Sequence, residues 1–145
     1  FTIEVTKEVE RINSSFKTKK WKPIILLAKH HNREEVQRLY KIANFCLVTS
    51  LHDGMNLVAK EYAAARYDEK GVLILSQYTG ASRELKDALI VNPYNGEQTA
   101  DAIKEALEMK DAEQIKRMRA MREVIENYNV YRWSADFLKS IVNLG

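Results

Sequence analysis

Residues 45–61 read FCLVTSLHDGMNLVAKE, a sequence that joins an apolar run to a turn and to the start of a helix. The apolar residues at 45–49 predict a strand, and Asp53-Gly54 is a favoured turn pair. A helix that begins directly after such a turn presents unpaired amide groups and the positive end of its dipole, which can hold a phosphate. Glu61, in the second turn of that helix, can accept hydrogen bonds from the two hydroxyls of a ribose. This junction is therefore the first candidate for a ligand site.

Outward from this stretch, apolar runs alternate with amphipathic segments. Further strands are predicted at 21–28, 71–76 and 88–91, and a short helix is predicted to end near residue 87. Other helices are predicted at 3–16, 55–66, 99–109, 112–128 and 130–144. One more helix is predicted to follow Asn32, its N-cap, with a buried stripe from Val36 to Ala43. Asp111 is the predicted N-cap of the helix at 112–128. One face of the last helix is predicted to pack, and it carries Val130, Trp133, Phe137 and Ile141. Strands that alternate with helices predict an α/β fold with a parallel sheet and right-handed crossovers.

The composition bounds the class of protein. A length of 145 residues suits one domain or a piece of a larger protein, and the first residue, Phe1, is not Met. The net charge of +3 is mild and the Lys and Arg residues are spread out, so nucleic acid is not an expected partner. No apolar run approaches the ~20 residues of a membrane-spanning helix, so no membrane is expected either. The one cysteine, Cys46, is interpreted as a small buried hydrophobe and predicts a reducing, cytoplasmic location.

Several blocks of the sequence occur in a recognisable order. They are FCLVTSLHDGMNLVAKEY at 45–62, VLILS at 72–76 with YTGA at 78–81, ALIVNPY at 88–94, ADAI at 100–103, and RW and DFL at 132–133 and 136–138. Together they resemble the donor-site region of the trehalose-6-phosphate synthase family of retaining glycosyltransferases. The resemblance implies an α/β, Rossmann-like domain with flanking helices, the C-terminal half of a two-domain GT-B enzyme. Residues 1–145 would be one incomplete domain that binds a nucleotide sugar, with the N-terminal acceptor domain absent.

The same resemblance assigns donor binding to a set of positions: His31, Asp53, Gly54, Met55, Asn56, Leu57, Val58 and Glu61. Residues 53–56 would contact the hexose and the diphosphate, and residues 57 and 58 would offer backbone amides. Glu61 would bind the ribose, and His31 stands where the family's chain passes the nucleobase. His52 stands where the family often has Arg.

The resemblance also implies an activity. The full enzyme would transfer glucose from UDP-glucose, or a related donor, to glucose 6-phosphate with retention at the anomeric carbon. No residue of this chain would act as a nucleophile, and no cofactor and no catalytic metal are implied, because helix amides can stabilise the charge of the leaving diphosphate. The expected partners are the nucleotide sugar and, through the missing domain, glucose 6-phosphate. The fragment alone should not turn over, since both domains must hold the reacting pair.

Alternatives stand beside these interpretations. Asp53-Gly54 can be a turn and nothing more, and Glu61 a solvated carboxylate. Lys60 is interpreted as a surface or packing residue, and His30-His31 as no metal site, because adjacent histidines rarely converge on one ion. The basic run Lys116, Arg117, Arg119 and Arg122 is interpreted as a solvated helix face.

Two other classes of function remain open at this point. One is a non-catalytic regulatory or assembly module that keeps the fold, and the other is a stand-alone flavodoxin-like receiver or binding domain. The lack of an acidic cluster at the strand ends speaks against a phospho-acceptor receiver. The base of the donor (UDP, GDP or ADP), the acceptor sugar and a homo-oligomeric state are also left open.

Overall fold

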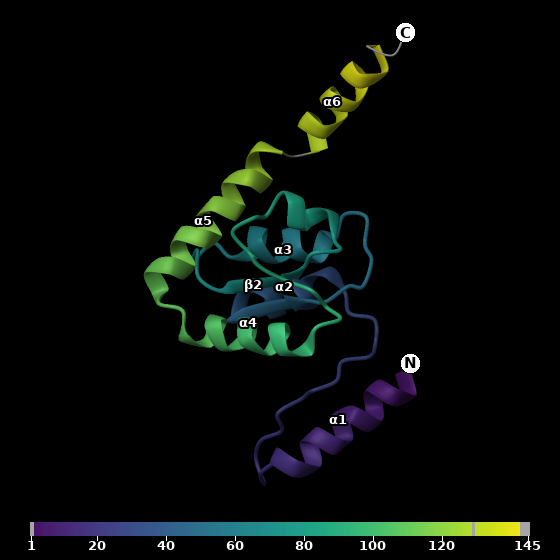
Figure 1. Ribbon diagram of the computed structural model, residues 1–145, viewed down its shortest axis with the longest axis vertical. Helices are drawn as coiled ribbons and strands as arrows, with labels where there is room; N and C mark the ends of the chain where they lie inside the picture. Colours follow the sequence, from purple (N-terminus) through teal and green to yellow (C-terminus); the bar gives the residue numbers. More distant parts are fainter. Residues whose placement is uncertain (1, 129, 143–145) are drawn as a thin grey trace. The chain divides into compact units, whose positions relative to one another are not determined.

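The computed structural model describes residues 2–128 and 130–142, apart from the side chains of residues 130, 133 and 136. The elements follow in the order α1 (Thr2–Phe16), α2 (Arg33–Ile42), β1 (Phe45–Val48), α3 (Leu57–Ala65), β2 (Val72–Ser76), the 3₁₀ helix η1 (Gly80–Arg83), β3 (Leu89–Val91), α4 (Gly96–Glu108), α5 (Asp111–Asn127) and α6 (Val130–Val142). The chain divides into two compact units, Phe1–Asn32 and Arg33–Gly145, and each is described by itself (Figure 1).

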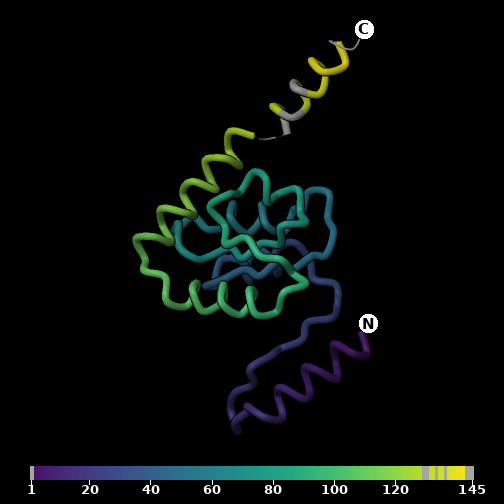
Figure 2. The backbone as a smooth tube through the Cα atoms, in the orientation of Figure 1, coloured from purple at the N-terminus to yellow at the C-terminus, as the bar shows by residue number. Residues whose placement is uncertain are grey.

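A three-stranded parallel sheet lies at the centre of the second unit. The strand order is β1-β2-β3, with Phe45 opposite Val72 and Ile74 opposite Leu89. Each strand passes into a helix or a loop at its carboxyl end before the next strand begins, as the backbone trace in Figure 2 shows. The predicted α/β fold with a parallel sheet is confirmed, and the strands predicted at 45–49, 71–76 and 88–91 form within a residue or two of the expected positions.

Helices cover both faces of this sheet. Because side chains alternate along a strand, neighbouring residues of β2 enter different cores. Leu73 and Leu75 face one cluster, and Val72 and Ile74 face the other. Helices α3 and α5 complete the first cluster through Ala59, Tyr62, Ala63, Met118 and Met121. Tyr40, on α2, and Ala43, just after it, pack at the margin of this cluster. The second cluster is completed by α4, through Ala102 and Ala106.

Two predicted features of the helices are wrong. Asp111 is the first residue of α5, and the N-cap is Lys110. The Asp111 carboxylate instead forms an ion pair with Lys70 Nζ at 2.6 Å. Leu39, predicted within the buried stripe of α2, is 42% exposed, whereas Val36 and Tyr40 are half-buried. Only one edge of α2 therefore touches the core.

The strand predicted at 21–28 does not form. This apolar run lies in the first unit, between α1 and α2, and its side chains are largely exposed, with Ile25 at 77%. A strand needs a neighbour for its amides and carbonyls. Here the side chain of Asn13, on α1, takes both backbone groups of Ile24: Asn13 Oδ1 accepts from the Ile24 amide and Asn13 Nδ2 donates to the Ile24 carbonyl, each at 3.0 Å.

The last helix, α6, ends at Val142 in the described part of the chain, so residues 143–144 of the predicted helix lie outside the described residues. On its predicted packing face, Phe137 and Ile141 are 53% and 52% exposed. The side chains of Val130 and Trp133, on the same predicted face, also lie outside the described residues. Within the described chain, every helix is either too short or too polar to cross a membrane.

Candidate functional site

The link between β1 and α3 is a turn closed by Asp53. Its Oδ1 atom accepts from the backbone amides of Met55 (3.1 Å) and Asn56 (2.9 Å), and its Oδ2 atom accepts from Asn56 Nδ2 (3.0 Å). These hydrogen bonds, that from the Met55 amide first, hold the pKa of the Asp53 carboxyl below its ordinary value. The Asp53 carboxylate is thus engaged within the turn.

Asn56 is the N-cap of α3 and has a left-handed backbone, with φ 70°. Asn tolerates this region better than most residues because its short polar side chain bonds locally. Its Oδ1 atom accepts from the Ala59 amide at 2.9 Å, and its Nδ2 atom also donates to Ser50 Oγ at 3.4 Å. The residue is 6% exposed, and its amide side chain is used inside the protein. Asn56 therefore shapes the turn, whatever else it contacts.

The capping pattern leaves particular amides of α3 available. The first four amides of a helix have no partner within the helix. In α3 the amide of Asn56 is bound to Asp53 and that of Ala59 to Asn56, so those of Leu57 and Val58 remain. The side chains of Leu57 and Val58 are 60% and 43% exposed, which leaves this helix end open to solvent. Such an end favours an anion.

A second loop holds the turn in place. The amide of Asp53 donates to the Tyr78 carbonyl (3.2 Å), that of Gly80 to the Asp53 carbonyl (3.1 Å), and that of Ala81 to the Met55 carbonyl (2.8 Å). A Cβ atom at Gly80 would overlap the carbonyl oxygen of Gly54. Gly80 is therefore required for the close approach of the two loops, a role that the sequence did not reveal because it depends on a distant segment.

Gly54 itself stands in open space. An added Cβ atom would meet no protein atom within 4 Å, and among the described glycines the positive φ belongs to Gly71, at 102°. Gly54 therefore does not serve to permit a positive φ. What remains is the turn itself, or the approach of a molecule from outside.

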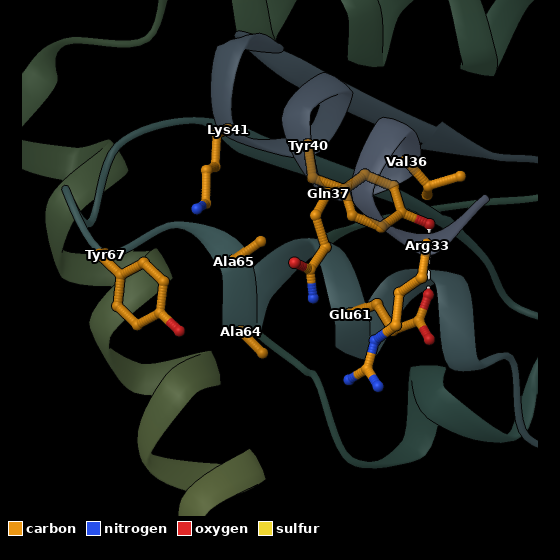
Figure 3. A pocket seen from close by; sticks show the side chains of 9 residues that line it. All are labelled: Arg33, Val36, Gln37, Tyr40, Lys41, Glu61, Ala64, Ala65 and Tyr67. Carbon is orange, nitrogen blue, oxygen red and sulfur yellow. Dashed lines mark hydrogen bonds between the residues drawn. The ribbon is translucent and has the colours of Figure 1, made fainter. Parts of the chain in front are cut away.

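Glu61 lies at a pocket of about 500 Å³ between α2 and α3 (Figure 3). The lining residues are Arg33, Val36, Gln37, Tyr40, Lys41, Glu61, Ala64, Ala65 and Tyr67. The Glu61 carboxylate is exposed, and its Oε2 atom accepts a hydrogen bond from the Tyr40 hydroxyl at 3.5 Å, drawn as a dashed line in Figure 3. Burial, then the charge of Glu61, raises the pKa of Tyr40 to about 12, so the phenol keeps its proton.

The structure thus brings residues 53–58 together at one strand end, with Glu61 one turn further along α3. Met55 is 47% exposed at this end. His31 belongs to the other unit, Phe1–Asn32, and its place beside a nucleobase stays a prediction, as do the donor contacts of the other residues.

Arg66 is a structural residue that the sequence did not single out. It is 5% exposed, and its Nη1 atom donates to the carbonyls of Tyr40 (3.2 Å), Lys41 (2.8 Å) and Ala43 (2.7 Å) at the end of α2. Its Nη2 atom donates to Asp68 at 2.9 Å. Arg66 therefore joins the ends of α2 and α3, the two walls of the pocket. Its burial could not be predicted, because nothing in the local sequence distinguishes this Arg from the other charged residues.

Other charged side chains also have local partners. Lys60 forms an ion pair with Glu84 at 2.8 Å, consistent with a surface or packing residue. Arg122 is only 17% exposed and donates to the carbonyls of Ala63 and Ala64, so the interpretation of its helix face as solvated is wrong at this residue. It is also wrong at Arg117, whose side chain is 28% exposed and donates to Glu113 and to the carbonyl of Asp87.

Cys46 is half-buried at the margin of the first core cluster, and burial raises the pKa of its thiol to about 11. The thiol therefore stays protonated at neutral pH and acts as a small apolar side chain. Over the described ranges, no three side chains of the His, Cys, Asp and Glu types gather as a metal ion requires.

Known proteins resemble this chain in sequence and in fold. A bifunctional trehalose-6-phosphate synthase/phosphatase of Thermoproteus tenax is 45% identical over 140 residues, which make up 97% of this chain and 19% of that protein. A solved E. coli structure bound with UDP-2-fluoro glucose is 40% identical, with a TM-score of 0.91, and the match covers 96% of this chain and 31% of the solved one. An alpha,alpha-trehalose-phosphate synthase (UDP-forming) from Burkholderia xenovorans, solved in complex with glucose-6-phosphate, gives a TM-score of 0.91 at 40% identity over 96% of this chain and 31% of its own.

This chain spans between 19% and 31% of the length of these relatives. The model of the family described as Glycosyltransferase family 20 matches residues 1–143. Since that match covers nearly every residue, the chain belongs to glycosyltransferase family 20.

Proposed function

We propose that this chain is the nucleotide-sugar-binding domain of a retaining glycosyltransferase that moves glucose from UDP-glucose to glucose 6-phosphate. One observation supports the proposal most directly: the turn at residues 53–56 caps α3 so that the amides of Leu57 and Val58 stay open, with Glu61 one turn behind them. The proposal covers residues 1–145 as part of a single donor-binding domain, with the acceptor held by a further domain.

Each group of the donor can be matched with residues at this end of the sheet. A diphosphate suits the N-terminus of α3, where amide groups and the helix dipole favour negative charge. From there the ribose would reach Glu61, whose carboxylate can accept hydrogen bonds from both hydroxyls. The hexose would lie against residues 53–55, where Gly54 leaves open space and Met55 is exposed. Uracil is the proposed base because one of the two solved relatives is named as UDP-forming and the other holds a UDP sugar.

The chemistry follows from charge rather than from a nucleophile. When the bond between the anomeric carbon and the diphosphate breaks, negative charge develops on the leaving phosphate oxygens. Fixed amides directed at those oxygens stabilise the charge without reorganising during the reaction. The turn supplies this rigidity, because the Asp53 side chain binds the amides of Met55 and Asn56 within it, and the amide of Gly80 ties it to the loop that follows β2. A cytoplasmic location and self-association stay predictions.

The test begins with donor affinity. In the complete gene product, Glu61→Ala should weaken UDP-glucose binding by about 1.5–3 kcal/mol, or 10- to 150-fold, the range for a hydrogen bond to a charged group. Isothermal titration calorimetry measures the affinity, and urea unfolding measures the stability, which should change little because Glu61 is exposed. Glu105→Ala, which removes an exposed carboxylate from α4, is the matched control and should bind as the parent does.

A second assay addresses the reaction. Formation of trehalose 6-phosphate from UDP-glucose and glucose 6-phosphate is the expected activity. A parent protein that binds no UDP-glucose would exclude a donor site. Binding without turnover would leave the donor site in place and favour the non-catalytic module instead. Equal affinity of the folded Glu61→Ala variant and its parent would remove Glu61 from the ribose.

A further inference from the structure

Tyr40 meets the carboxylate of Glu61 across the gap between α2 and α3. Its hydroxyl donates to Glu61 Oε2 at 3.5 Å, and both side chains line the pocket between the two helices (Figure 3). Because only one carboxylate oxygen takes part, the other oxygen remains for a further donor. The Tyr40 hydroxyl therefore contacts the carboxylate that we propose to bind the ribose, and it does so without contacting the ligand itself.

The ring of Tyr40 is itself held in place. It packs edge-on against Tyr62, with ring centroids 6.1 Å apart and an interplanar angle of 76°. Tyr62 is fully buried, and its hydroxyl lies 3.3 Å from the Ala43 carbonyl. The backbone carbonyl of Tyr40 accepts from Arg66. The hydroxyl oxygen of Tyr40 is thus positioned by the core and by the end of α2, whereas Glu61 is an exposed side chain that could adopt other rotamers without this contact.

We propose that Tyr40 is a positioning residue for nucleotide recognition: its hydroxyl orients the Glu61 carboxylate toward the vicinal ribose hydroxyls of the bound nucleotide. The inference rests on the proposed function, because it takes Glu61 as the ribose-binding group. A carboxylate held at one oxygen loses less conformational freedom when the ligand binds, so the pair binds the diol more tightly than Glu61 alone.

The experiment compares two tyrosines that differ in what their hydroxyls contact. Tyr40→Phe keeps the ring and removes the hydroxyl that faces Glu61. Tyr62→Phe also removes one hydroxyl, but this hydroxyl faces backbone carbonyls at the end of α2. Binding of UDP and of 2′,3′-dideoxy-UDP to the complete gene product is measured by calorimetry, and thermal unfolding is followed for each variant.

Tyr40→Phe should weaken UDP binding about 3- to 10-fold, the effect of one lost hydrogen bond, and leave 2′,3′-dideoxy-UDP unchanged. Tyr62→Phe should lower the melting temperature and leave the affinity for both nucleotides unchanged. In the Glu61→Ala background, Tyr40→Phe should cause no further loss, since the two residues act through one interaction.

Two results overturn this inference alone, and a third overturns the proposed function as well. Equal weakening of UDP and 2′,3′-dideoxy-UDP by Tyr40→Phe would show a general structural effect, because a merely structural role does not distinguish the two ligands. Parent-like UDP affinity in Tyr40→Phe, alongside weak binding by Glu61→Ala, would sink the role of Tyr40 and leave the proposed function standing. A parent that binds no UDP would instead remove the proposed function and this inference with it.

Discussion

Gly54 and Gly80 lie on two loops that are hydrogen-bonded to each other, yet they should respond in opposite ways to the same added methyl group. At Gly54 the new Cβ atom would meet no protein atom within 4 Å, and no positive φ has to be kept. Gly54→Ala should therefore leave the free energy of unfolding unchanged or raise it by up to about 1 kcal/mol, through the lower entropy of the unfolded chain.

At Gly80 the new Cβ atom would overlap the Gly54 carbonyl oxygen, and that atom belongs to backbone, which cannot rotate away. The loops would have to separate, which strains the bonds from Gly80 to Asp53 and from Ala81 to Met55. Gly80→Ala should therefore lower the free energy of unfolding by about 1–3 kcal/mol, the range for overpacking a well-filled site.

The effect on the donor separates the two variants further. If the sugar or the diphosphate approaches Gly54 closely, Gly54→Ala should weaken UDP-glucose binding at least about 10-fold, equivalent to about 1.4 kcal/mol, and Gly54→Val should abolish it. Urea unfolding and calorimetry on the same samples give both quantities. Parent-like affinity in Gly54→Ala would remove Gly54 from the donor site. A loss of more than about 1 kcal/mol of stability in Gly54→Ala would refute the reasoning from open space.

Two further predictions concern the side chains that build the turn. Hydrogen bonds hold the Asp53 pKa below its ordinary value of 3.8, so this carboxylate stabilises the fold above pH 3.8, and the stability is lost as the pH falls through the lower folded pKa. Urea unfolding from pH 7 to pH 2.5 should show a smaller acid loss in Asp53→Asn than in the parent, and equal losses would contradict the assignment. Asn56→Ala should cost about 2–3 kcal/mol, from the lost cap and the left-handed backbone, whereas Asn56→Gly should cost about 1 kcal/mol because glycine accepts that backbone. Equal costs in urea unfolding would show that the backbone conformation contributes nothing.

The strands of the sheet could be predicted because each is a short apolar run bounded by polar or turn residues. The run at 21–28 has the same pattern but forms no strand. Its amides and carbonyls need a partner strand, and pairing is a non-local property that the run itself does not encode. In the described part of its own unit, the partner of Ile24 is the side chain of Asn13.

The sequence predicts the turn after β1 and the start of α3, but not the contacts that distant segments make with them, and donor binding there stays a prediction. The turn after β1 and the helix start could be read from residues 53–57, since Asp-Gly and Asn-before-helix are local signals. Those same local signals also favour hydrogen bonds from Asp53 and Asn56 to the turn itself, which both residues make. The contacts of Gly80, Tyr40 and Arg66 depend on segments distant in sequence, and no local pattern announces them.

The limited packing of α2 has a consequence for local unfolding of the protein. This helix has no fully buried residue, and Ile42 is 75% exposed. It is held at one edge by Tyr40 and at its end by the guanidinium of Arg66. Elements with little buried apolar surface open locally at a lower free energy than the core strands do. Each such opening of α2 would separate Tyr40 from Glu61 and remove one wall of the pocket. A nucleotide seated there would therefore slow the hydrogen exchange of amides in α2, a helix that supplies none of the backbone groups proposed to hold its phosphates.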